Sequence, residues 1–169
     1  KEIIAADPDG KMGMTDYGKL RVSCTELAEF LQGRAACYGQ GVVKRESGPL
    51  ERFLEKYPAT KLKKEAYTSL SSYYSSWTNK EEAEKFFERA FALYPDDPWL
   101  RYSYTINAVY SKENIDRAIE VAEEMNPFSS ATAANIRAQL YAHKGDLAQA
   151  EAVYGKEFGE SLITGLTSN

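Results

Sequence analysis

The sequence has little of what most active sites and membrane segments require. It contains two cysteines and one histidine among 169 residues. Two cysteines do not make a disulfide framework, and a single histidine has no second one to share a metal with. No window approaches the roughly 20 apolar residues of a membrane span. We therefore expect neither a disulfide-stabilised fold nor insertion into a membrane.

An excess of positive charge is also missing. The net charge is −4, and lysine and arginine form no stripe. Because nucleic-acid binding depends on neutralising phosphates, no nucleic-acid partner is expected. The remaining composition, 43% apolar and 27% charged, is ordinary for a soluble protein with a buried core. The chain begins at Lys1 rather than Met. Two interpretations therefore stay open, namely a processed protein and a piece of a longer protein.

No pattern for catalysis or metal binding is present. His143 has no cysteine near it in sequence, and there is no Gly-rich phosphate loop or nucleophile elbow. A partial imitation of a calcium loop lacks its first acidic ligand and is interrupted by Pro8; its residues are Asp7, Asp9, Gly10 and Asp16. We predict a protein that is not an enzyme, with no metal and no cofactor.

The two cysteines are expected to be free, partly buried thiols. On one continuous helix Cys24 and Cys37 would lie about 19 Å apart, which is too far for a disulfide. A break at Gly33 would relax that limit, so their redox state stays open.

The most informative segment is Glu65–Asp97, which has the pattern of two amphipathic helices joined by a tight turn. Large residues of the first helix recur at three- and four-residue spacing: Tyr67, Leu70 and Tyr74. The second helix carries Ala83, Phe87, Ala90, Phe91 and Leu93, and then ends at Tyr94-Pro95. A lone helical hairpin cannot bury both of its faces, so neighbours stacked on it are expected.

Two similar hairpins follow. The equivalent alanines Ala83, Ala118 and Ala150 are spaced 35 and 32 residues apart. The second hairpin starts near Trp99 and stops at Asn126-Pro127, which predicts a shortened second helix. Its predicted packing residues are Tyr102, Ile106, Val109, Ile115, Ala118, Ile119, Ala122 and Met125. Those of the third, around a turn at Gly145-Asp146, are Ile136, Leu140, Tyr141, Leu147, Ala150, Val153 and Tyr154.

These residue choices and this spacing resemble the tetratricopeptide repeat family, whose period is about 34 residues. The resemblance implies an all-α fold, a right-handed superhelical array of helical hairpins, after a short β-hairpin-like N-terminal segment. The predicted divisions are a leader (1–22), a leading helix, loop and half repeat (23–63), three repeats (64–97, 98–130 and 131–161) and a tail (162–169). Helix ends such as Tyr57-Pro58 resemble those of bacterial envelope proteins with degenerate repeats. A periplasmic location is one option, although the sequence leaves localisation open.

The N-terminal residues predict a different kind of structure. Glu2–Ala6 is strand-like, Asp7–Gly10 is a turn, and Lys11–Leu20 returns as a second strand. Ser23 or Thr25 then caps a helix from Cys24 to about Tyr38, with Leu27, Phe30 and Leu31 on its apolar side. Over residues 1–38 this order resembles the C-terminal part of a thioredoxin-like domain; the alternative is an unrelated hairpin.

In the tetratricopeptide family, the first helix of each repeat lines a concave groove. Carried onto this sequence, the lining residues are Thr68, Ser72, Ser75, Ser103, Asn107, Tyr110, Asn135, Gln139 and His143. All nine can form hydrogen bonds, and none is charged at neutral pH unless His143 is protonated. Such a lining suits peptide amides or Ser, Thr, Asn and Gln side chains. The alternative is that these residues merely face solvent.

The resemblance also bears on the partner. Chaperone-binding members clamp a C-terminal carboxylate with Lys and Asn, and Thr68 and Ser72 stand at those positions here. We therefore predict a non-catalytic protein- or peptide-binding scaffold whose partner is not a chaperone C-terminal tail. The alternatives are a C-terminal, substrate-positioning part of a thioredoxin-like redox protein, and an array that packs on its own kind. Trp77 and Trp99 are interpreted as packing residues between repeats, with an exposed binding role as the alternative.

Overall fold

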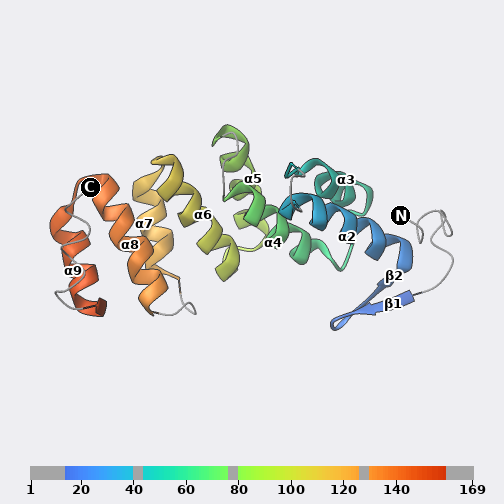
Figure 1. Cartoon of the computed structure of the whole chain (residues 1–169). Coiled ribbons are helices and arrows are strands. Elements are labelled where there is room, and N and C mark those ends of the chain that lie inside the picture. The colour runs from blue at the N-terminus through green and yellow to red at the C-terminus, as the bar shows by residue number, and fades with distance from the viewer. Residues whose placement is uncertain (1–13, 40–43, 76–79, 126–129, 159–169) are drawn as a thin grey trace. The chain divides into compact units, whose positions relative to one another are not determined.

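The computed structural model describes residues 14–39, 44–75, 80–125 and 130–158. Within these ranges the chain forms a two-stranded hairpin followed by eight helices (Figure 1). The prediction of a mainly helical fold after a short N-terminal hairpin is confirmed. The chain divides into two compact units, Lys1–Tyr73 and Tyr74–Asn169.

The hairpin of the first unit consists of β1 (Met14–Tyr17) and β2 (Leu20–Ser23), which pair antiparallel with Tyr17 opposite Leu20. Gly18 has a φ of 61°, which a glycine adopts without strain and which permits the tight connection. The predicted single strand over Lys11–Leu20 is therefore wrong, because a turn divides its described part. The predicted strand Glu2–Ala6 and turn Asp7–Gly10 lie outside the described residues.

The helices α2 (Cys24–Tyr38) and α3 (Gly48–Lys56) pack against each other in the first unit. Ser23 caps α2, since its hydroxyl accepts a hydrogen bond from the backbone N–H of Glu26 at 3.1 Å. Phe30 of α2 is buried, with its ring centroid 5.7 Å from that of Phe53 in α3. Leu31, predicted to lie on the same apolar side, is 43% exposed, because successive helical residues point about 100° apart.

The first unit ends within α4 (Lys63–Tyr74), whose residues up to Tyr73 belong to it and which buries Ala66 and Leu70. Arg45 connects its last turn to α2. The guanidinium donates to the carbonyl of Cys37 at 2.6 Å and to that of Ser72 at 2.7 Å. Carbonyl groups near two helix ends thus gain a charged donor.

The second unit contains α5 (Lys80–Leu93), α6 (Pro98–Ser111), α7 (Ile115–Glu123), α8 (Ser130–Lys144) and α9 (Leu147–Phe158). Within it, α6 contacts α5, α7 and α8, and α8 contacts α7 and α9. The helices follow a regular register. The first helices α4, α6 and α8 begin at residues 63, 98 and 130, and the second helices α5, α7 and α9 begin at 80, 115 and 147. In each pair, the first residue of the second helix therefore lies 17 residues after the first residue of the first helix.

The repeated alanines occupy one position in this register. Ala83, Ala118 and Ala150 are each the fourth residue of a second helix, and their exposed fractions are 0%, 0% and 4%. A small buried side chain lets two helix backbones approach closely. Aromatic residues fill the space nearby in α5 and α6, where the Phe87 and Tyr104 rings meet edge to face at 5.3 Å.

Several predicted packing residues are less buried than expected. Tyr102 and Ile106 are half-buried, whereas the core side of α6 is formed by Leu100, Tyr104 and Ala108. α6 has neighbours on several sides, so a single apolar stripe does not describe its burial. The predictions for Leu93 and Leu147 are wrong, since these residues are 48% and 59% exposed. Both stand at a terminal position of their helix.

Candidate peptide-binding surface

The predicted lining residues of α4 belong to the first unit. Thr68 and Ser72 lie five and nine residues after the start of the helix, and both are half-buried. The Thr68 hydroxyl donates to the carbonyl of Lys64 at 3.0 Å, and the carbonyl of Ser72 receives Arg45. Thr68 also lines a pocket, so its side chain stands at a hollow of the molecular surface.

That pocket has a volume of about 240 Å³ and is lined by residues of β1, α2 and α4. Its lining residues are Tyr17 from β1, Phe30, Arg34 and Tyr38 from α2, and Lys64, Glu65, Thr68 and Ser69 from α4. Sequence reasoning found only Thr68 among them. The four-residue spacing of Phe30, Arg34 and Tyr38 is the signal that places the α2 residues on one stripe.

The predicted residues around α6 have three different environments. Ser103 is 4% exposed, so the prediction that its side chain is offered to a ligand is wrong. Its helix is covered by α5, α7 and α8, which buries this position. The side-chain amide of Asn107 donates to the carbonyl of Tyr74 at 2.8 Å, and Tyr110 is 68% exposed. Ser75, which follows α4 directly, is half-buried.

The predicted residues of α8 lie nearer to solvent. Asn135 and His143 are exposed, and Gln139 is half-buried. The Asn135 side-chain oxygen accepts two hydrogen bonds, one from the Gln139 amide at 2.8 Å and one from the Tyr154 hydroxyl at 2.8 Å. These bonds fix the orientation of the Asn135 amide. His143 lies thirteen residues after the start of α8, whereas Tyr110 lies twelve after the start of α6, so the two are not equivalent.

The second unit thus brings together part of the predicted set. Because α6 contacts α8, the polar residues of these two helices lie on neighbouring elements. The members with side chains that reach the surface are Asn107, Tyr110, Asn135, Gln139 and His143. Among the residues that the structure describes, no cluster of His, Cys, Asp and Glu is arranged to hold a metal ion.

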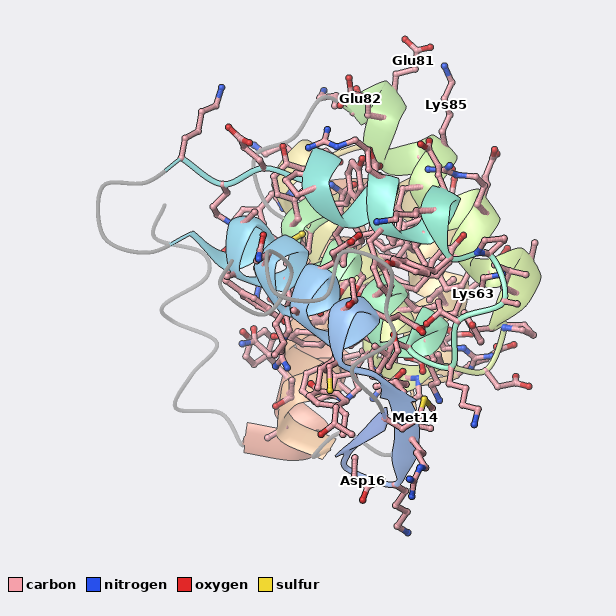
Figure 2. The ribbon with its side chains drawn as sticks, turned by 90° about the vertical axis from the view of Figure 1, so that its right-hand side faces the viewer. Met14, Asp16, Lys63, Glu81, Glu82 and Lys85 are labelled. Atoms are coloured by element: carbon pink, nitrogen blue, oxygen red, sulfur yellow. The ribbon has the colours of Figure 1, made fainter. Side chains whose placement is uncertain are left out.

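The second helices of the same unit carry a different surface. Figure 2 shows Glu81, Glu82 and Lys85 at the start of α5, and the Lys85 ammonium pairs with the Glu81 carboxylate at 2.5 Å. Arg117 of α7 pairs with Glu84 of α5 at 3.1 Å. The charged runs Lys80–Glu82 and Glu123–Glu124 are exposed, as expected of solvated helix faces. Charged residues are therefore concentrated on α5 and α7, whereas α6 and α8 carry few.

The cysteines and tryptophans complete the set of candidates. Cys24 and Cys37 are free, and burial raises the pKa of the Cys37 thiol to about 11. Trp99, interpreted as a packing residue, is instead 55% exposed, with its ring 6.1 Å from that of Tyr102. It is the second residue of α6, at an end of the helix where the neighbouring helices leave it open. Trp77 lies outside the described residues.

No helix in the described ranges has the length and apolar character needed to cross a bilayer. The searches of curated proteins and of solved structures gave no significant match. The thioredoxin-like resemblance of residues 1–38 gained no support from the comparisons. A family model described as "Tetratricopeptide repeat" matches residues 64–97, a segment that contains α5 and all of α4 except its first residue. Residues 64–97 are therefore similar to a tetratricopeptide repeat, in agreement with the resemblance noted from the sequence.

Proposed function

We propose that this protein is a non-catalytic scaffold that binds an extended segment of a protein partner through the uncharged polar side chains of α6 and α8. A tetratricopeptide repeat points to protein–protein interaction, and stacked helical repeats present extended binding surfaces. The surface and the type of segment are our inference from the side chains described above.

One observation carries this proposal: α6 and α8 have little charge, although they belong to a charged protein. α6 has one charged residue in 14, whereas α5 has seven in 14. An uncharged surface binds a peptide without the cost of removing water from unpaired charges. The amides of Asn107, Asn135 and Gln139 supply both donors and acceptors, which are the groups that a peptide backbone requires.

The members of this surface differ in what they offer a partner. The amide of Asn107 already donates to the carbonyl of Tyr74, so it contributes to the fold of the second unit. Asn135 uses its oxygen internally, which directs its amide nitrogen toward a partner. Tyr110, at 68% exposure, offers a large ring together with a hydroxyl. Tyrosine is enriched among residues that dominate binding energy, so we place the anchor of the surface at Tyr110.

The test uses the full chain as bait for a library of random displayed peptides. We expect enriched peptides that are poor in charge and bind in the micromolar range when remade and measured by calorimetry. Tyr110→Ala and Asn135→Ala should each weaken binding at least tenfold. Glu120→Ala, which changes an exposed residue of α7, is the matched control and should leave the affinity within twofold.

Two results contradict the proposal. One is the absence of any enriched peptide relative to an unrelated helical protein. The other is binding that Tyr110→Ala and Asn135→Ala both leave intact, which would place the interaction on another surface. Circular dichroism of each variant separates lost binding from lost folding.

The redox alternative has weaker support. It rests on the strand, strand, helix order alone, and the comparisons do not support it. Reactive cysteines, however, require exposure and a lowered pKa, whereas Cys37 is buried and burial raises its thiol pKa. We therefore favour the scaffold.

A further inference from the structure

We propose that the pocket between β1, α2 and α4 is a specificity pocket for a side-chain carboxamide, that of glutamine or asparagine, on a bound peptide. The inference rests on the proposed function, because it takes the partner to be a peptide, and it adds the chemical class of one of its side chains. The pocket of about 240 Å³ is smaller than the roughly 300–1,000 Å³ of typical small-molecule sites. It suits one side chain better than a cofactor.

Aromatic rings form much of the pocket wall. Phe30 is fully buried, and the ring of Tyr17 meets it edge to face with centroids 5.6 Å apart. Tyr38 adds a third ring, over which the Arg34 guanidinium carbon lies at 5.8 Å from the centroid. Such walls shield the methylene groups of a long side chain from water.

Polar groups of both signs stand in the same pocket. Arg34 donates to the Tyr17 hydroxyl at 2.6 Å, which holds the guanidinium at the wall. A guanidinium has five N–H donors, so it can also donate to a ligand oxygen. Glu65 lines the pocket from α4, and among the described residues its Oε2 atom is buried with no hydrogen-bond partner.

The unpartnered oxygen of Glu65 calls for a donor. A buried acceptor without a donor is unfavourable, and the terminal torsion of a glutamate side chain is broad. Because Glu65 lines the pocket, a donor bound there is placed to give its carboxylate a further hydrogen bond. Thr68 adds an acceptor, since its hydroxyl hydrogen is directed to the carbonyl of Lys64.

Comparison of ligand classes selects the carboxamide. A cationic side chain would satisfy Glu65 but would meet Arg34 and the exposed Lys64. An anionic side chain would pair with those cations but would face the Glu65 carboxylate. An apolar side chain would leave Glu65 without a donor. A carboxamide donates two N–H groups, to Glu65 and Thr68, and its oxygen accepts from Arg34.

The test titrates capped tripeptides into the isotopically labelled full chain. The peptides differ only in the central residue, which is glutamine, glutamate, lysine or leucine. The backbone amide signals of Thr68 and Ser69 report the pocket. We expect saturable shifts with the glutamine peptide in the millimolar range and at least tenfold weaker binding of the other three. No shift with the glutamine peptide would overturn the inference, as would equal binding of any other peptide.

Variants test the assigned groups. Glu65→Gln keeps the size of the side chain but removes the charged acceptor, and it should weaken glutamine-peptide binding at least tenfold. Thr68→Val, which removes the second acceptor, provides an independent check should Glu65→Gln disturb folding. Glu55→Gln, at an exposed residue of α3 outside the pocket, is the matched control and should bind as the native protein does. Unchanged binding by both pocket variants would contradict the assignment.

Failure of this inference is distinguishable from failure of the proposed function. If display-selected peptides bind in a Tyr110-dependent manner while the glutamine tripeptide does not bind, the pocket assignment is wrong and the scaffold function stands. If no peptide is selected and the tripeptide fails as well, both are wrong. If the tripeptide binds but no selected peptide depends on Tyr110, the pocket is supported and the α6–α8 surface is wrong.

Discussion

The contact between α2 and α3 gives a prediction with a magnitude. Gly33 lies within α2 where that helix meets the start of α3, and it is buried. A Cβ atom added there would lie 2.9 Å from the Leu50 Cα and 3.0 Å from the Leu50 backbone nitrogen. These are main-chain atoms, so no side-chain rotation relieves the overlap. Gly33→Ala therefore forces the two helices apart.

Two opposing effects set the size of the change. Overpacking a well-packed core costs roughly 1–3 kcal/mol, while replacing glycine by alanine inside a helix gains about 1 kcal/mol. Gly33→Ala should thus lower the free energy of unfolding by about 0–2 kcal/mol. Gly155 in α9 is the matched control, because it is exposed and a Cβ there would meet no described atom within 4 Å. Gly155→Ala should show only the stabilisation of about 1 kcal/mol that comes from replacing glycine by alanine inside a helix.

Hydrogen exchange followed by mass spectrometry measures both variants locally. Peptides that cover α2 and α3 should lose protection in Gly33→Ala, and peptides that cover α9 should gain it in Gly155→Ala. The two local free energies should differ by roughly 1–3 kcal/mol, which is the overpacking cost alone. If Gly33→Ala raises protection as much as Gly155→Ala does, the close approach of α2 and α3 is refuted.

Three further predictions concern single side chains. Asp97→Ala removes the N-cap bonds of α6 and should lower the free energy of unfolding by about 1–2 kcal/mol in urea; Asp96→Ala, at a 92% exposed side chain, should cost less than about 0.5 kcal/mol. Iodoacetamide at pH 8 should alkylate the half-buried Cys24 in the native protein but Cys37 only after unfolding, because burial raises the Cys37 pKa to about 11; mass spectrometry distinguishes the two. Burial also raises the pKa of Tyr104 to about 12. An unfolded tyrosine ionises near pH 10, so the stability from this neutral phenol should persist below pH 10 and fall as the pH rises toward 12. Ultraviolet titration should show a late transition that Tyr104→Phe removes.

Much of the helical framework was predictable from local signals in the sequence. Ser23 and Asp97 cap helices, and the alanines at 83, 118 and 150 recur because each repeat needs a small residue at one helix crossing. Each of these signals involves only a few neighbouring residues, so it can be recognised in the sequence without knowledge of tertiary contacts. The hairpin was harder to predict. Sequence reasoning placed the turn at Asp7–Gly10 and interpreted Lys11–Leu20 as one strand, although Gly18 also has turn chemistry.

The pocket could not be predicted in the same way. Tyr17, Arg34 and Glu65 come from three elements separated by many residues, and only tertiary packing places them at one hollow. The missing partner of Glu65 Oε2 is likewise a property of the folded unit. No periodicity in the chain reports an unsatisfied atom. The positions that pattern reasoning overlooked are thus the ones that depend on long-range contacts.

The transfer of groove positions from one repeat to another is limited by burial. Ser103 and Asn135 both lie five residues after the start of a first helix, yet Ser103 is buried and Asn135 is exposed. Both helices contact three others of their unit, α6 contacting α5, α7 and α8 and α8 contacting α6, α7 and α9, so equal numbers of neighbours leave one position buried and the other exposed. Asn107 and Gln139 both lie nine residues after the start of their helix. The Asn107 side chain donates to the backbone carbonyl of Tyr74, whereas that of Gln139 donates to the side chain of Asn135. A substitution at Asn107 therefore tests folding, and one at Asn135 tests binding. Residues at equivalent positions of two repeats share the same backbone geometry. The role of each residue, however, depends on what its side chain contacts.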